Sequence, residues 1–67
     1  MIAKFALIAY LSLNPMQPNE LSGFVVDHDM AEEDCDAAAE RPQMVMLQKG
    51  VYLTITNTAV LNCEEQP

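Results

Sequence analysis

The sequence predicts a small α+β domain, in which a four- or five-stranded, mostly antiparallel sheet carries one helix packed on one face. Three observations lead to this prediction: an apolar run near the N-terminus, a short acidic segment with helical spacing, and alternating apolar residues over the C-terminal third. The 67 residues, with 51% hydrophobic content, correspond to one folded domain, residues 1–67. A chain of this length buries only about 60% of its unfolded surface. It usually needs a disulfide, a metal or a partner subunit, so a homodimer is one expectation.

The N-terminal segment, residues 1–13, has two interpretations. Lys4 followed by the apolar run 5–13 resembles the start of a secretory signal peptide. No small-x-small cleavage site follows, and the run is too short to cross a bilayer as a helix. A continuous apolar run is also typical of a central strand buried on both faces. We expect a strand over residues 2–13, with the signal peptide as the alternative.

A loop and a second strand come next. Residues 14–20 contain two prolines and two asparagines, which break any periodic element. Residues 21–28 predict a strand with Phe24, Val26 and His28 on one face and Val25 among the residues on the other.

The segment from Asp27 to Glu40 is the best helix candidate and holds seven of the ten acidic residues. Asp29 is expected to be the N-cap, because Glu32 follows three residues later with the spacing of a capping box. The helix is expected over about residues 30–40. It should end before Arg41, because Pro42 disfavours helical geometry at the preceding residue.

This helix is predicted to have two unlike faces. On a period of 3.6 residues, one face is small and directed at the sheet, and the other is acidic and directed at solvent. The small face contains Ala31, Cys35, Ala38 and Ala39; the acidic face contains Glu32, Glu33, Asp36 and Glu40.

The C-terminal third predicts a hairpin. A two-residue turn at Lys49-Gly50 would place Met46 opposite Leu53 and Met44 opposite Ile55. From residue 51 to residue 63, the odd-numbered positions are the ones expected to face the core, with no change of phase. This pattern fits either a loop over 56–58 with residue 57 at positive φ or one bent strand. The five methionines could form an adaptable surface, but we expect them to fill the core.

The two cysteines permit one disulfide and match no zinc pattern. Cys35 is on the predicted buried side of the helix, and Cys63 has the parity of the sheet face that the helix would cover. A bridge between them is therefore favoured over free thiols. It would close a loop of about 28 residues, add roughly 3–4 kcal/mol of stability, and imply an oxidising compartment.

The formal charge of −7 limits the partners. Nucleic acid and anionic membrane surfaces repel such a chain, whereas a protein with a basic surface is attracted. A solvated face that only keeps the protein soluble is the simpler alternative. The residues expected to bind a basic partner are Asp29, Glu32, Glu33, Asp34, Asp36 and Glu40.

The sequence contains little that supports a catalytic site or a metal site. His28 could be a base or a metal ligand, but we expect a surface histidine at a turn. The acidic segment lacks the glycine and the final glutamate of a calcium-binding EF-hand loop. No Ser-His-acid set or phosphate-binding glycine loop is suggested. We expect no enzyme, no metal site and no cofactor.

The order of features resembles that of small phage and bacterial accessory proteins. The matching features are an apolar N-terminus, the strand Phe24-Val25-Val26, an acidic helix with Cys-x-x-Ala from Cys35 to Ala38, and a last strand ending in Cys63. The resemblance implies a non-enzymatic accessory protein, such as an inhibitor of a host or defence protein. The acidic face adds the expectation that it could mimic nucleic acid, and we expect it to act in the cytoplasm of the host cell. The alternative is an exported, disulfide-stapled structural domain of the periplasm or cell envelope.

Overall fold

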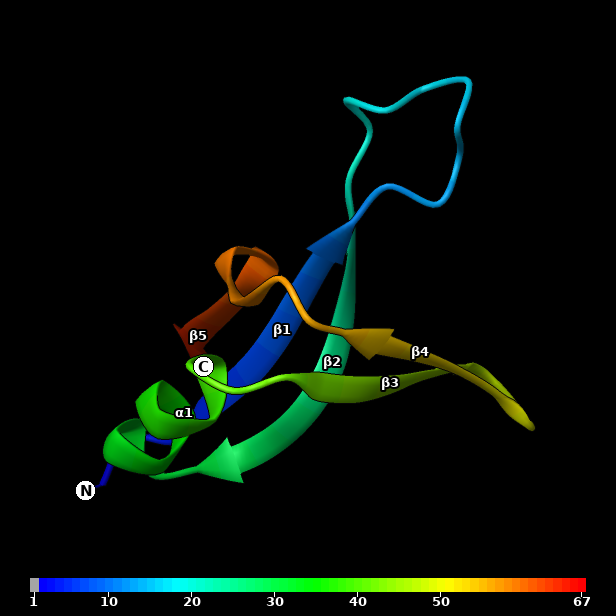
Figure 1. Ribbon diagram of the computed structural model, residues 1–67. Coiled ribbons are helices and arrows are strands. Elements are labelled where there is room, and N and C mark those ends of the chain that lie inside the picture. Colours follow the sequence, from blue (N-terminus) through cyan, green and yellow to red (C-terminus); the bar gives the residue numbers. More distant parts are fainter. Residues whose placement is uncertain (1) are drawn as a thin grey trace.

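The computed structural model describes residues 2–67, and Met1 lies outside this range. The strands are β1 (Phe5–Leu11), β2 (Ser22–Met30), β3 (Gln43–Gln48), β4 (Val51–Ile55) and β5 (Leu61–Glu65). One helix, α1 (Glu32–Ala39), follows β2, and a short 3-10 helix, η1 (Thr58–Val60), precedes β5. One helix with antiparallel strands confirms the predicted α+β class (Figure 1).

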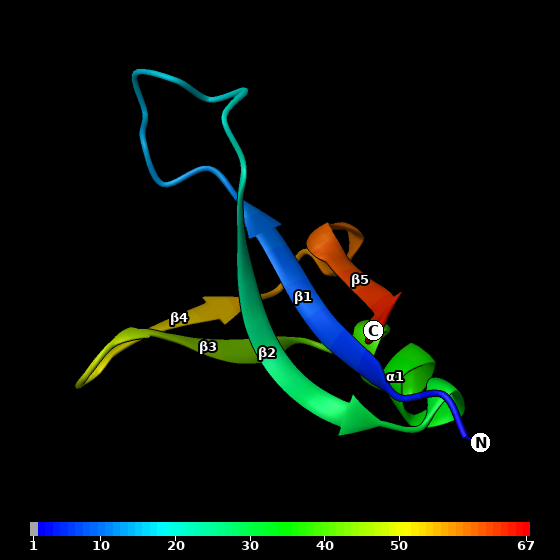
Figure 2. The same ribbon diagram turned by 180° about the vertical axis from the view of Figure 1, so that it is seen from behind.

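The strands form two sheets rather than one. The larger has the order β2-β1-β5 and the smaller is the hairpin β3-β4, all pairings being antiparallel. The hairpin crosses the larger sheet at a steep angle, with β3 beside β2 (Figures 1 and 2). The helix α1 packs on β1 and β5.

The apolar N-terminal run forms the central strand, as expected, but over Phe5–Leu11 rather than residues 2–13. β1 pairs with β2 on one side and with β5 on the other. Leu7 is 1% exposed and Ala9 is fully buried, so this strand supplies the middle of the core. The other core residues come from the helix and from β3, β4 and β5: Cys35, Val45, Ile55 and Leu61.

Two irregularities bend β2 along β1. Phe5 pairs with Met30 and Leu7 with Asp27, so two residues of β2 lie opposite one residue of β1, and a second shift follows Leu7. Bulges of this kind curve a strand and increase its twist. The strand ends at Met30, two residues beyond the predicted end at His28.

The predicted turn at Lys49-Gly50 is present, but the predicted facing of the methionines is wrong. Gly50 has φ 83°, and Gln48 pairs with Val51 across the turn. A register shift then follows, so that Met46 pairs with Tyr52 and Met44 with Thr54. One extra residue reverses the faces of a strand. Val45 therefore enters the core, and both methionines are exposed rather than buried.

The segment between β4 and β5 is neither a hairpin nor one continuous strand. Asn57 has φ −84°, so the expected positive φ is wrong. Its side-chain Oδ1 accepts a hydrogen bond from the backbone N–H of Ala59 at 3.1 Å and caps η1. This turn transfers the chain from one sheet to the other. The predicted parity nevertheless holds, because Ile55 and Leu61 are both buried.

Candidate functional site

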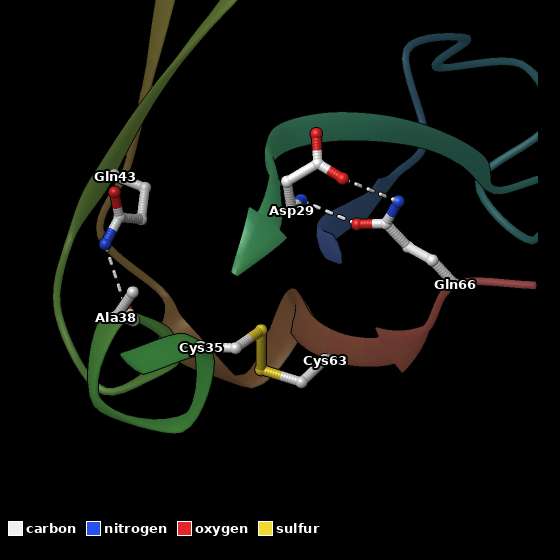
Figure 3. Close-up of a disulfide and its surroundings, with 6 residues drawn as sticks. All are labelled: Asp29, Cys35, Ala38, Gln43, Cys63 and Gln66. Atoms are coloured by element: carbon white, nitrogen blue, oxygen red, sulfur yellow. Dashed lines mark hydrogen bonds between the residues drawn. A yellow bond between two sulfur atoms is a disulfide. The ribbon is translucent and has the colours of Figure 1, made fainter. Parts of the chain in front are cut away.

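The acidic helix α1 is the element that carries the sequence-predicted site, and a covalent bond holds it to the sheet. Cys35 is fully buried and forms a disulfide with Cys63 of β5, with 6.0 Å between their Cα atoms (Figure 3). The predicted bridge is confirmed. Ala38 and Ala39 are half-buried beside Cys35, whereas Ala31, predicted for the same face, is exposed.

The predicted N-cap is wrong. Asp29 lies within β2, and the N-cap position is occupied by Ala31, whose side chain makes no capping hydrogen bond. β2 continues to Met30, so Asp29 belongs to the strand and not to the start of the helix. Three acidic residues in the first turn, Glu32, Glu33 and Asp34, still suit the positive end of the helix dipole.

The C-terminal end of α1 is held by side chains that reach back to its carbonyl groups. Gln43 Nε2 donates to the backbone oxygen of Ala38 at 2.7 Å (Figure 3), and Arg41 Nε donates to that of Ala37 at 3.3 Å. The sequence analysis did not predict the contact of Gln43, because this residue lies in the next strand. The same two oxygens also accept hydrogen bonds from backbone N–H groups, Ala37 from Glu40 and Ala38 from Arg41, so the side chains reinforce a last turn that the backbone already closes.

The predicted acidic face is exposed to solvent. Glu32, Glu33, Asp34, Asp36 and Glu40 are all exposed. Within residues 2–67, none of these five carboxylates lies in an ion pair, because the one ion pair found joins His28 and Asp29. The helix therefore presents negative charge that the described part of the chain does not neutralise.

Three of these carboxylates surround a shallow hollow. Its apolar lining is formed by the N-terminal residues Ile2 and Ala3, by Phe5 of β1 and by Ala31; its acidic lining consists of Glu32, Glu33 and Asp36. Asp34 and Glu40 are exposed but do not line it, and Asp29 is also separate from it. The structure thus brings three of the six predicted partner-binding residues together around one apolar depression.

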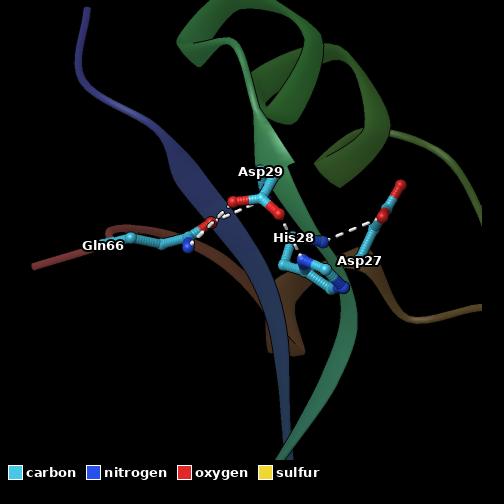
Figure 4. Close-up of polar contacts among 4 residues, drawn as sticks. All are labelled: Asp27, His28, Asp29 and Gln66. Carbon is cyan, nitrogen blue, oxygen red and sulfur yellow. Dashed lines mark hydrogen bonds and ion pairs between the residues drawn. The ribbon is translucent and has the colours of Figure 1, made fainter.

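The histidine and its acidic neighbours form a separate polar cluster (Figure 4). His28 Nδ1 lies 2.9 Å from Asp29 Oδ2, and the backbone N–H of His28 donates to Asp27 Oδ1 at 2.8 Å. Gln66 Oε1 accepts from the backbone N–H of Asp29 at 2.6 Å, which ties the C-terminal residues to β2. No group of three or more His, Cys, Asp or Glu side chains suited to a metal occurs in residues 2–67.

Comparison of the chain with protein-family models, curated proteins and solved structures found no match. Among residues 2–67, no helix is both long and apolar enough to cross a membrane.

Proposed function

We propose that this chain is a non-enzymatic binding protein whose acidic face docks on a basic surface of another protein and modulates or inhibits it. The observation that carries this proposal is the set of exposed, unneutralised carboxylates on a helix that a disulfide anchors to the sheet. Anchoring fixes the carboxylates relative to one another before a partner arrives. Less conformational entropy is then lost on binding.

The charge pattern favours a partner over a merely solvated surface. Glu32 and Asp36, and then Asp36 and Glu40, are four residues apart, and such like-charged pairs each destabilise an isolated helix by about 0.2–0.5 kcal/mol. A basic surface would turn this repulsion into attraction and would accelerate encounter. A surface that otherwise holds nucleic acid is one example of such a target.

The hollow beside α1 suits the side chain of a partner's arginine or lysine. These side chains combine an aliphatic stem with a charged head group. Ile2 and Phe5 would contact the stem, while the carboxylates of Glu33 and Asp36 would receive hydrogen bonds from the head group.

A capture experiment with matched charges tests the proposal. Glu33→Gln with Asp36→Asn removes two negative charges from the acidic face, and Glu20→Lys changes the net charge equally in the distant loop. We expect a host protein that is retained by the wild type and by Glu20→Lys but bound about tenfold more weakly by the double variant. Binding should also weaken as salt is raised through about 0.1–0.15 M. Equal retention on all three proteins would contradict the proposal.

The disulfide favours a second candidate, an exported structural domain of the periplasm or cell envelope. Disulfides persist mainly in oxidising compartments. Mass analysis of the protein purified from its native host distinguishes the two: an intact N-terminus with free thiols supports the binding protein, and a shortened N-terminus with the bridge formed supports export.

A further inference from the structure

The outer face of the β3-β4 hairpin is an apolar surface that the described chain leaves uncovered. We name it the methionine face and define it by Met44, Met46, Tyr52 and Thr54, which the cross-strand register places side by side. Met44, Met46 and Tyr52 are 60%, 57% and 60% exposed. The opposite face of the same hairpin contributes Val45 and Ile55 to the core. A two-stranded sheet is marginally stable by itself, so a second covered face would stabilise it.

We propose that a second copy of this chain covers the methionine face. The charge distribution indicates this occupant. Residues 41–63 contain no Asp or Glu, although the whole chain carries ten acids and a net charge of −7. Two copies repel each other when both present α1 or the His28 region to the contact. On the acid-free β3-β4 hairpin, two copies can meet without bringing carboxylates together.

The geometry fits a symmetric contact. The hairpin projects away from the larger sheet (Figures 1 and 2), so its outer face is accessible to a partner hairpin. A two-fold contact would pack the same side chains against each other, as in most homodimers. Methionine adapts its shape to such a contact, and tyrosine adds a large apolar surface with a polar tip.

The size of the face predicts a weak dimer. Three large side chains per copy give an interface at the low end of the range for specific complexes, below about 1,200 Å² in total. Dissociation constants in the micromolar range are expected for such a contact. The dimer would leave the acidic helix of each copy free, so the function proposed above does not depend on it.

Sedimentation equilibrium between about 1 µM and about 1 mM chain tests the proposal. We expect the wild type to form a dimer within this range, and Met46→Glu to weaken that dimer at least tenfold. Val25→Glu is the matched control, because Val25 is an apolar strand residue of nearly equal exposure, 59%, on β2. It adds the same charge and should leave the dissociation constant within about twofold of the wild type. Tyr52→Ser removes apolar surface without changing the charge, so a weaker dimer there cannot come from added repulsion.

The salt response separates this contact from binding by the acidic face. Salt screens the repulsion between two copies of charge −7, so the dimer should strengthen or hold its affinity as salt rises. Charge-driven docking on a basic partner should weaken under the same conditions. A wild type that remains monomeric throughout, or a Met46→Glu dimer as tight as that of Val25→Glu, would overturn the proposal. Circular dichroism of each variant confirms that the fold is kept.

Discussion

At the scale of single residues, Asp29 holds an uncommon backbone conformation for a structural purpose. Its φ of 56° is the one positive value of a non-glycine residue in residues 2–67. Aspartate tolerates this left-handed region better than most residues do. The resulting turn of the chain directs the backbone N–H of Asp29 to Gln66 Oε1 and its carboxylate to His28. The C-terminal residues are thereby tied to the end of β2.

This cluster predicts an acid-dependent loss of stability. The hydrogen bond with His28 lowers the pKa of Asp29 below its ordinary value, and Gln66 adds to the effect, while partial desolvation opposes it. Because the folded pKa is depressed, ionised Asp29 contributes stability above the unfolded pKa of about 3.9, and this contribution is lost as pH falls through the folded pKa. Urea unfolding from pH 6 to pH 2 should show a shallower pH dependence for Asp29→Asn than for wild type. Identical pH slopes would show that the cluster does not act on stability.

At the scale of elements, the sequence predicted which segments fold but not how each strand is aligned. The continuous apolar run identified β1, and the period of two identified the parity of Ile55, Leu61 and Cys63, because burial leaves a pattern in the chain. The bulges in β2 and β3 left no comparable signal. Each adds one residue to one strand, and each such addition reverses the facing of the residues beyond it. For this reason the methionines of β3 were expected inside and are found outside.

For the helix, too, some features could be predicted from the sequence and others could not. Its acidic face and its buried cysteine were predicted from the 3.6-residue period, since that period depends on local spacing alone. The predicted capping box does not form, because Asp29 lies in strand β2 and not at the start of the helix. The hollow beside α1 could not be foreseen, since it needs Ile2 and Phe5, which are some thirty residues distant in sequence. Local spacing predicts faces, whereas a site built from remote segments requires the topology.

The central strand should be the element most sensitive to truncation. Leu7 is 1% exposed and lies between β2 and β5. Leu7→Ala removes buried methyl groups and leaves a cavity, so we expect a loss of about 2–5 kcal/mol in the free energy of unfolding. Val25→Ala on the exposed face of β2 is the control and should change it by about 0.5 kcal/mol or less. Guanidinium unfolding of both variants provides the measurement, and similar losses would contradict this assignment of the core.

At the scale of the whole molecule, two small sheets and one short helix share a core of few side chains. The sequence could not show that β4 and β5 belong to different sheets, because parity constrains the face of a strand and not its neighbours. The molecule is elongated, with a longest extent of 43 Å, and its core is correspondingly thin. A domain of this size rarely obtains more than about 3–5 kcal/mol from its core alone. The connection between α1 and β5 through the disulfide therefore has a large share in whether the chain folds.

Removal of the disulfide is expected to leave the domain close to its unfolding threshold. Cys35 and Cys63 are 28 residues apart, and the chain-entropy model assigns about 3–4 kcal/mol to closing a loop of that length. The helix should respond first, because Cys35 is its one fully buried side chain. Urea unfolding with and without reductant should show a loss of about this size in wild type. A variant with both cysteines changed to alanine should be as unstable as the reduced wild type, and reductant should not change its stability.

Amide exchange should show α1 losing protection before β1 does. If wild type kept its stability under full reduction, confirmed by thiol labelling, packing alone would hold the helix, and the bridge would have no major part in presenting the acidic face.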